Sequence, residues 1–318
     1  MPVTEGAETT PEHQPPDPAS PAAPRVVLWT RGPGCAELAA LLASGRAARV
    51  EGAIDQACVR EQADLVVQRK LSSFDLIDVA VPSDFDPDVV GHVVAAIGGG
   101  PHSTLAALVA ERLGTALGVP ATAVSGYRDA DDRAGAELLL SQTIAATSLD
   151  GTTVQVTKAA DLIEQLPEKS LVVLGAAGGN WFQRQLSGPG HRLTAKAPAG
   201  AVVVRHSPLK AFQTMLPPSG LSPHLLTADA LALMEYPVAP IVDGGAVLGV
   251  VRWAALMGLR RDEPIGSVTE DAPLVGVMEP AAAVEEVSEF YDGSPVPLVD
   301  GRGMLVGMAP APAERPSV

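Results

Sequence analysis

The sequence has few aromatic residues, few cysteines and no long apolar run, and each shortage excludes a class of protein. Aromatic side chains make up only 3% of the 318 residues, so a core must be built from small aliphatic residues, as in layered α/β proteins. The two cysteines, Cys35 and Cys58, have no Cys-x-x-Cys or Cys/His cluster around them. This argues against a zinc site and for free thiols in a reducing compartment. No apolar run approaches the roughly 20 residues that span a bilayer.

Basic residues are also scarce, which limits the partners of the protein. The chain has 22 Lys and Arg against 37 Asp and Glu, and its formal net charge is −15. Bulk charge of this sign disfavours nucleic acid and anionic membranes, so we expect neither as a partner. The N-terminal residues are Pro-rich and acidic, where a secretory signal would need basic residues and an apolar core. We therefore expect a cytoplasmic protein.

Composition divides the chain into three regions between two tails. Residues 1–24 and 311–318 have too few large apolar side chains to offset the entropy of ordering, so both tails are expected to be disordered. Strands alternate with helices in an N-terminal α/β region, residues 25–91, and in a second region, residues 92–207. This alternation predicts an α/β fold with parallel strands. The third region, residues 208–310, has a different pattern and is considered below.

The apolar periodicity also predicts individual elements within the first two regions. Strands are expected at residues 26–29, 49–51, 64–68, 76–81, 93–97, 119–124, 153–157, 171–174 and 200–205, and helices at residues 35–42, 54–62, 104–117, 135–148 and 159–166.

A glycine-rich stretch follows the apolar strand at residues 171–174, and it contains Gly175, Gly178 and Gly188. Glycines at a strand end allow backbone N–H groups to approach a phosphate, and a following helix N-terminus adds a favourable dipole. The alternative is an ordinary strand-to-helix turn without a ligand, because such turns are common in α/β proteins.

The spacing of these glycines, G-x-x-G-x(9)-G, resembles that of the universal stress protein family, and residues 93–207 resemble its domain. A second anchor is the segment Gly98-Gly99-Gly100-Pro101, which is similar to the family's V-D-G-S-P opening. The resemblance implies an ATP or other adenine-nucleotide site with a Rossmann-like sheet. Two family ligands are missing, because Gly98 replaces an acidic residue and Pro189 replaces a Ser or Thr, so weak binding is expected. The residues that the resemblance assigns to the site are Gly98, Gly99, Gly100, Gly175, Gly178, Gly188 and Pro189.

The third region contains an internal repeat. The segment Pro240–Gly244 recurs 57 residues later as Pro297–Gly301, and each copy follows an expected helix and precedes an apolar strand. A helix, strand, Asp-Gly turn and strand at this period resemble a pair of cystathionine-β-synthase (CBS) domains. The resemblance implies an α+β pair related by an approximate two-fold axis. The family's adenosyl-binding hydroxyl and carboxylate are both absent, since their positions are occupied by Arg252 and Ala255, and by Pro310 and Ala313.

The sequence shows no pair of catalytic residues. The six histidines are scattered, although His102 and His191 are both expected near the glycine loops, where Arg184 adds positive charge. The acidic cluster that begins at Asp129 lacks metal-ligand spacing and is interpreted as a solvated loop. No Walker-type lysine follows the glycines, so the protein is not expected to be an enzyme.

Three functions remain open at this point. The first is a cytoplasmic, non-enzymatic stress-response or regulatory protein that senses adenine nucleotides weakly. The second is a ligand-free interaction or scaffold module that keeps both folds and binds an unknown protein partner. The third is an enzyme with its site in residues 25–91. A homodimer is also expected, because both resembled families commonly dimerise and the Val202–Val204 strand is expected at an exposed sheet edge.

Overall fold

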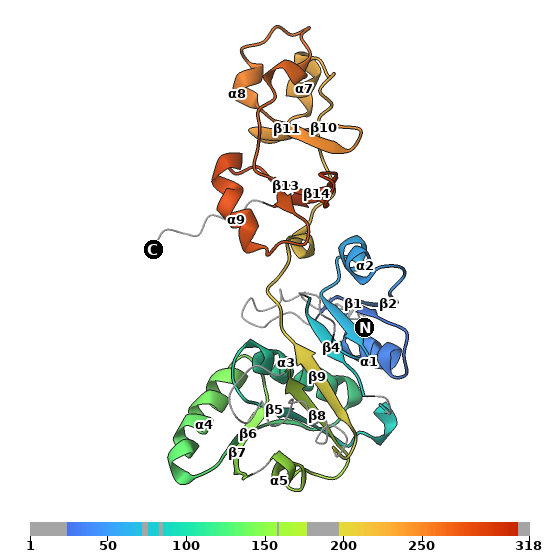
Figure 1. The fold of residues 1–318 in the computed structure, drawn as a ribbon, viewed down its shortest axis with the longest axis vertical. Coiled ribbons are helices and arrows are strands. Elements are labelled where there is room, and N and C mark those ends of the chain that lie inside the picture. Colours follow the sequence, from blue (N-terminus) through green and yellow to red (C-terminus); the bar gives the residue numbers. More distant parts are fainter. Residues whose placement is uncertain (1–23, 72–75, 83–84, 158, 177–196, 311–318) are drawn as a thin grey trace, which may run out of the picture.

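The computed structural model describes residues 24–71, 76–82, 85–157, 159–176 and 197–310. Figure 1 shows a large sheet with its helices at one end of the molecule and two smaller sheets stacked beyond it. The expected tails lie outside the described residues, apart from Pro24 at the boundary of the first.

The large sheet has nine strands in the order β2-β1-β3-β4-β9-β8-β5-β6-β7, and every pairing except β4–β9 is parallel. The α/β class is therefore confirmed. The bounds of the strands are β1 Val26–Trp29, β2 Arg46–Arg49, β3 Leu65–Gln68, β4 Asp78–Ala80, β5 His92–Ala96, β6 Ala121–Tyr127, β7 Asp150–Gln155, β8 Ser170–Gly175 and β9 Ala201–Arg205.

Helices cover both faces of this sheet. Neighbouring residues of a strand point to opposite faces, so they pack against different helices. Val93 of β5 packs in the cluster that contains α1, α3 and α4 residues, whereas the next residue, Val94, packs in the cluster that contains Leu162 of α5. Helix α2 contributes Cys58 to a third cluster. The bounds of these elements are α1 Cys35–Leu42, α2 Ile54–Glu61, η1 Pro87–Val89, α3 Pro101–Leu117, α4 Ala130–Ile144 and α5 Ala159–Ile163.

The two halves of the sheet meet where β4 pairs with β9, and this pairing joins the first two regions of the chain and corrects one prediction. Residues 25–91 do not form a sheet of their own, because β4 joins them to the strands of residues 92–207. Strand β9 was expected at an exposed edge, but Asp78 and Val79 of β4 pair with its residues Arg205 and Val204. The side chain of Asp78 is fully buried at this seam, where one of its oxygens lies 4.0 Å from the Arg205 Nε atom.

Helix α4 and strand β2 also differ from the predictions. The Asp129 side chain, expected in a solvated loop, accepts hydrogen bonds from the N–H groups of Asp131 and Asp132 at 3.1 and 3.2 Å. It caps α4, which starts at Ala130 rather than at residue 135. Strand β2 lies three residues before the expected position, because its Arg-Ala-Ala-Arg sequence is mostly exposed and has no apolar signal.

Beyond β9, the chain forms two small units of one design. The first unit comprises residues 217–259 and the second residues 271–310, and a connecting segment, residues 206–216 or 260–270, precedes each unit. Each contains a helix, then a hairpin with an Asp-Gly turn, and Figure 1 shows them stacked end to end. Helix η2 Ala211–Thr214 precedes the first unit, which contains α7 Thr227–Leu233, β10 Val238–Asp243, β11 Ala246–Arg252 and α8 Trp253–Leu256. Helix η3 Ile265–Val268 precedes the second unit, which contains β12 Val275–Gly276, α9 Ala282–Ser288, η4 Glu289–Tyr291, β13 Val296–Val299 and β14 Leu305–Ala309.

Matched hydrogen bonds show that the two units are related by an approximate two-fold axis. The Val247 N–H donates to the Gly303 carbonyl at 3.1 Å, and the Leu305 N–H donates to the Gly245 carbonyl at 2.8 Å. Gly303 and Leu305 each lie 58 positions after their counterparts, Gly245 and Val247, so the two hairpin turns exchange equivalent bonds. The predicted repeat is therefore confirmed.

The connecting segment before each unit packs on the other unit. The Ala211 N–H, which precedes the first unit, donates to the Glu279 carbonyl of the second unit at 2.9 Å. Its counterpart 54 residues later, the Ile265 N–H, donates to the Leu225 carbonyl at 3.0 Å. The chain entering the first unit thus packs on the second, so the two units depend on each other.

Candidate functional site

The strands that lead into the two predicted glycine loops end at one edge of the large sheet. Strands β5 and β8 are parallel neighbours, and Ala96 pairs with Leu174 near their carboxyl ends. Gly98–Gly100 and Gly175 therefore reach the same edge, which is where ligands bind in open α/β sheets. The other expected site residues, Gly178, Gly188 and Pro189, lie outside the described residues.

The loop after β5 uses one of its own donors internally. The Gly98 N–H donates to the Ser103 hydroxyl oxygen at 3.1 Å, and Ser103 is fully buried in α3. Gly99 and Gly100 have φ angles of 93° and 77°, a conformation that glycine adopts without strain. The loop is therefore shaped to enter α3, and the Gly98 N–H is not free to bind a phosphate.

His102 also has a local role at this edge. Its Nδ1 atom accepts a hydrogen bond from the backbone N–H of His206 at 2.9 Å. Burial, followed by the nearby His206 and Arg205, lowers the pKa of His102, which favours the neutral ring that this bond requires. The structure thus links His102 to the chain that leaves β9. Its expected neighbours His191 and Arg184 lie outside the described residues.

The two cysteines of the N-terminal region are poor candidates for an enzyme nucleophile. Both are fully buried. Burial raises the pKa of the Cys58 thiol to about 12, and it also raises that of Cys35, so neither is a thiolate near neutral pH. Among the residues that the structure describes, no group of three His, Cys, Asp or Glu side chains is arranged to hold a metal.

The first unit contains a cavity of about 580 Å³ at the end of its hairpin. The segment Met234–Val238 forms one wall, the segment Arg252–Ala254 forms another, and Asp292 of the second unit completes the lining. Tyr236 and Trp253 are 46% and 40% exposed. Neither residue was identified from the sequence as part of a site. The chain has few aromatic residues, so two of them on either side of one hairpin could have indicated a binding site.

Arg252 occupies the position where the CBS resemblance expects a hydroxyl ligand. Its side chain instead contacts the second unit. Its Nη2 atom donates to the Phe290 carbonyl at 3.0 Å, and its guanidinium lies 4.8 Å from the centre of the Phe290 ring. Its Nε atom also pairs with the Glu270 carboxylate. Ala255 offers no carboxylate, and Ala313 lies outside the described residues.

The second unit differs from the first at the matching place. Tyr291 follows α9 at the same distance as Tyr236 follows α7, but Tyr291 is fully buried and its hydroxyl donates to the Pro273 carbonyl at 2.7 Å. The two units are therefore not equivalent, and the half-exposed aromatic pair belongs to the first unit.

No protein-family model matches the chain, and no curated protein sequence matches it. Several solved structures resemble part of the chain, and some of these are CBS domain pairs. They include the cytosolic domain of the Mg²⁺ channel MgtE in complex with ATP (19% identity, TM-score 0.29) and the CBS domains of a transcriptional regulator from Streptococcus pneumoniae (21%, 0.30). Another is a CBS domain pair/ACT domain protein from Thermotoga maritima (16%, 0.31). Each likeness covers 32% of this chain, together with 45%, 93% and 89% of the other chains in that order.

Proposed function

We propose that the protein is a non-enzymatic regulatory protein that senses adenine nucleosides or nucleotides weakly through the cavity of its first unit. The observation that carries this proposal is the pair of half-exposed rings, Tyr236 and Trp253, in the lining of a 580 Å³ cavity. The volume lies within the range of about 300–1,000 Å³ that is common for small-molecule sites. Aromatic side chains bind nucleobases by stacking, which contributes about 1–3 kcal/mol per base.

The charges that line this cavity favour a ligand with few phosphates. Glu235 and Asp292 bring two carboxylates to the lining, while the guanidinium of Arg252 is already paired with Glu270. A polyphosphate would meet net negative charge here. We therefore propose that adenosine binds more tightly than AMP, and AMP more tightly than ATP.

The glycine edge of the large sheet is the weaker candidate for nucleotide binding. The Gly98 N–H is used by Ser103, and the sequence has neither the family's acidic residue nor its hydroxyl at residue 189. A hydrogen bond to a charged group contributes about 1.5–3 kcal/mol, so the loss of two or three such bonds lowers affinity by about 10²–10⁴. ATP is therefore expected to bind there with a dissociation constant well above micromolar.

Calorimetric titration with adenosine, AMP and ATP tests the cavity of the first unit. Trp253→Ala is expected to weaken adenosine binding about 5- to 100-fold, because it removes one stacking partner. Leu248→Ala is the matched control, since Leu248 is 51% exposed on β11 and does not line the cavity. Adenosine binding that is unchanged in Trp253→Ala would contradict this site. No binding to the unmodified protein at millimolar concentration would favour the ligand-free scaffold.

The proposal also includes a cytoplasmic location and a homodimer. No helix of the described chain is long and apolar enough to cross a membrane. The exposed edge of β9 no longer supports a dimer, because β4 covers it. The exposed apolar residues of the first unit support one instead, since Leu233 and Met257 are 60% and 66% exposed on helix α7 and just after helix α8, which contact each other.

Light scattering at micromolar concentration is expected to give the mass of a dimer. Replacing both Leu233 and Met257 by Glu is expected to give the mass of a monomer, because a charge in an apolar interface is costly. Replacing Leu138, which is 60% exposed on α4, by Glu should leave the dimer intact. A monomer mass for the unmodified protein would contradict the dimer.

A further inference from the structure

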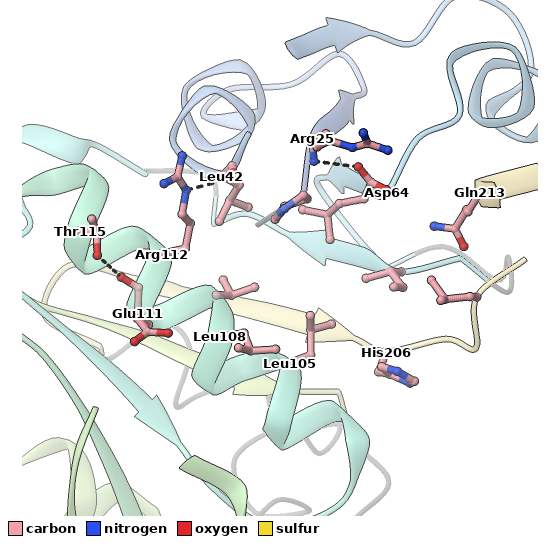
Figure 2. A pocket seen from close by; sticks show the side chains of 15 residues that line it. Arg25, Leu42, Asp64, Leu105, Leu108, Glu111, Arg112, Thr115, His206 and Gln213 are labelled. Carbon is pink, nitrogen blue, oxygen red and sulfur yellow. Dashed lines mark hydrogen bonds between the residues drawn. The ribbon is translucent and has the colours of Figure 1, made fainter. Parts of the chain in front are cut away.

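A larger cavity, of about 840 Å³, lies in another part of the molecule. Figure 2 shows that helix α3, the N-terminal strands and the chain after β9 surround it. None of the glycine-loop residues and none of the residues lining the cavity of the first unit contribute to its lining. It is therefore a separate candidate site of a size that suits a small molecule.

The walls of this cavity are aliphatic. Leu105 and Leu108 of α3 are partly exposed to it, while Leu42, Leu65 and Val109 are buried behind its surface. Apolar walls of this kind favour an apolar occupant, because contact removes both surfaces from water. The cavity is thus suited to a hydrocarbon chain rather than to a sugar or a nucleotide.

The acidic groups at its rim already have hydrogen-bond donors. One Asp64 side-chain oxygen accepts from the N–H groups of Arg25 and Val26 at 2.8 and 2.9 Å. One Glu111 oxygen accepts from the Ser148 N–H at 2.6 Å and from the Ser148 hydroxyl. Backbone donors therefore offset part of the negative charge on both carboxylates.

A basic side chain at the rim, by contrast, has no partner of its own. Within the described residues, the Arg25 guanidinium makes no ion pair and no hydrogen bond, and it lines the cavity beside Asp64 (Figure 2). Arg112 approaches from the other side and donates to the Ala43 carbonyl at 2.9 Å. A guanidinium binds a carboxylate through two parallel hydrogen bonds, so the rim is suited to a single carboxylate.

We propose that this cavity binds a straight-chain fatty acid, with the alkyl chain against Leu105 and Leu108 of α3 and the carboxylate at Arg25. The strongly acidic chain disfavours a ligand that carries several negative charges. The chain after β9 contributes Leu209 and Gln213 to the same cavity, and the Gln213 amide donates to the Ala63 carbonyl at 3.2 Å. The bound acid therefore contacts the segment that leads from the large sheet to the two units.

Calorimetric titration with octanoate, decanoate and dodecanoate, each below its critical micelle concentration, tests the chain of the ligand. Each added methylene is expected to strengthen binding about three- to fourfold, since each buries further apolar surface. Dodecyltrimethylammonium, which has the same chain and the opposite charge, is expected to bind at least tenfold more weakly than dodecanoate. Affinity that is independent of chain length, or equal for both charges, would overturn the proposal.

Two matched pairs of variants test the location. Leu108→Trp fills the cavity and is expected to weaken dodecanoate binding at least tenfold, whereas Leu138→Trp, at an exposed position of α4, should not change it. Arg25→Gln is expected to weaken dodecanoate at least fivefold while leaving dodecanol unchanged, and Arg302→Gln in the second unit is its control. Leu105→Phe provides a second filling variant if Leu108→Trp does not fold. Unchanged dodecanoate binding in a folded filling variant would overturn the location.

Discussion

Gly249→Ala is expected to lower the free energy of unfolding by about 2–5 kcal/mol. Gly249 lies in β11 with a φ angle of +151°, where a side chain is strained. A Cβ atom there would overlap the Glu270 carbonyl oxygen and lie 2.9 Å from the Thr269 side chain. Glu270 cannot move away, because its backbone exchanges hydrogen bonds of 2.9 and 3.0 Å with Val250. Overpacking costs about 1–3 kcal/mol and backbone strain a similar amount.

The repeat supplies two comparisons for this prediction. Gly307, 58 residues later, faces the Met215 side chain and the Leu216 carbonyl, and a Cβ atom at residue 307 would lie 2.7 Å from that carbonyl oxygen. Because Met215 is flexible, Gly307→Ala is expected to cost less, about 1–3 kcal/mol. Gly301→Ala has open space and should change stability by less than about 0.5 kcal/mol. Denaturant titration measures the free energy of unfolding of all three variants. Equal stability of the Gly249→Ala and Gly301→Ala variants would contradict the close packing of β11 against residues 269–270.

Elements with strong local signals could be predicted from the sequence. Strand β1 and helix α1 have the predicted bounds, because an apolar run and a Gly-Pro-Gly turn mark where each begins or ends. The repeat was visible because Asp243 and Asp300 stand in nearly identical surroundings. Two glycine loops that each follow an apolar strand also indicate that these strands are neighbours, and β5 and β8 do pair in parallel.

The pairing of β4 with β9 could not be predicted, because it joins residues more than 120 positions apart with no local pattern. Strand β4 has three residues, and one of them is the buried Asp78, which reads as a surface residue in sequence. The same limit applies to both cavities. Arg25 and Gln213 line the larger one, so only the fold brings its wall and its rim together.

The glycine site shows a different limit of sequence reasoning. The Gly98–Gly100 loop lies at the sheet edge, as its position directly after an apolar strand predicts. The sequence could not show that Ser103 takes the Gly98 N–H, because that bond depends on how α3 begins. The sequence therefore indicates where this loop lies more readily than which of its N–H groups are free.

Phe212→Ala is the second substitution with a large expected effect, and it tests how the large sheet is joined to the two units. Phe212 is fully buried, and it belongs to one apolar cluster with Leu28 and Cys58 of the sheet and its helices and with Tyr291 and Val296 of the second unit. Removing a buried Phe side chain costs about 3–5 kcal/mol, because it leaves a cavity as well as losing buried surface. Hydrogen bonds beside the cluster, from the Gln62 amide to the Met215 carbonyl and from Gln213 to Ala63, are too few to replace it.

Since Phe212 packs on both parts, its loss is expected to separate their unfolding as well as to weaken the protein. The unmodified protein should unfold in one calorimetric transition, and Phe212→Ala should show two, with the two units unfolding first. Leu209→Ala is the control, because Leu209 is 54% exposed three residues earlier in the same segment; it should cost less than about 0.5 kcal/mol. A single transition for Phe212→Ala with unchanged midpoint would show that the units are not held to the sheet by this cluster. The contact of Leu209 and Gln213 with the larger cavity would then provide no route from a bound ligand to the two units.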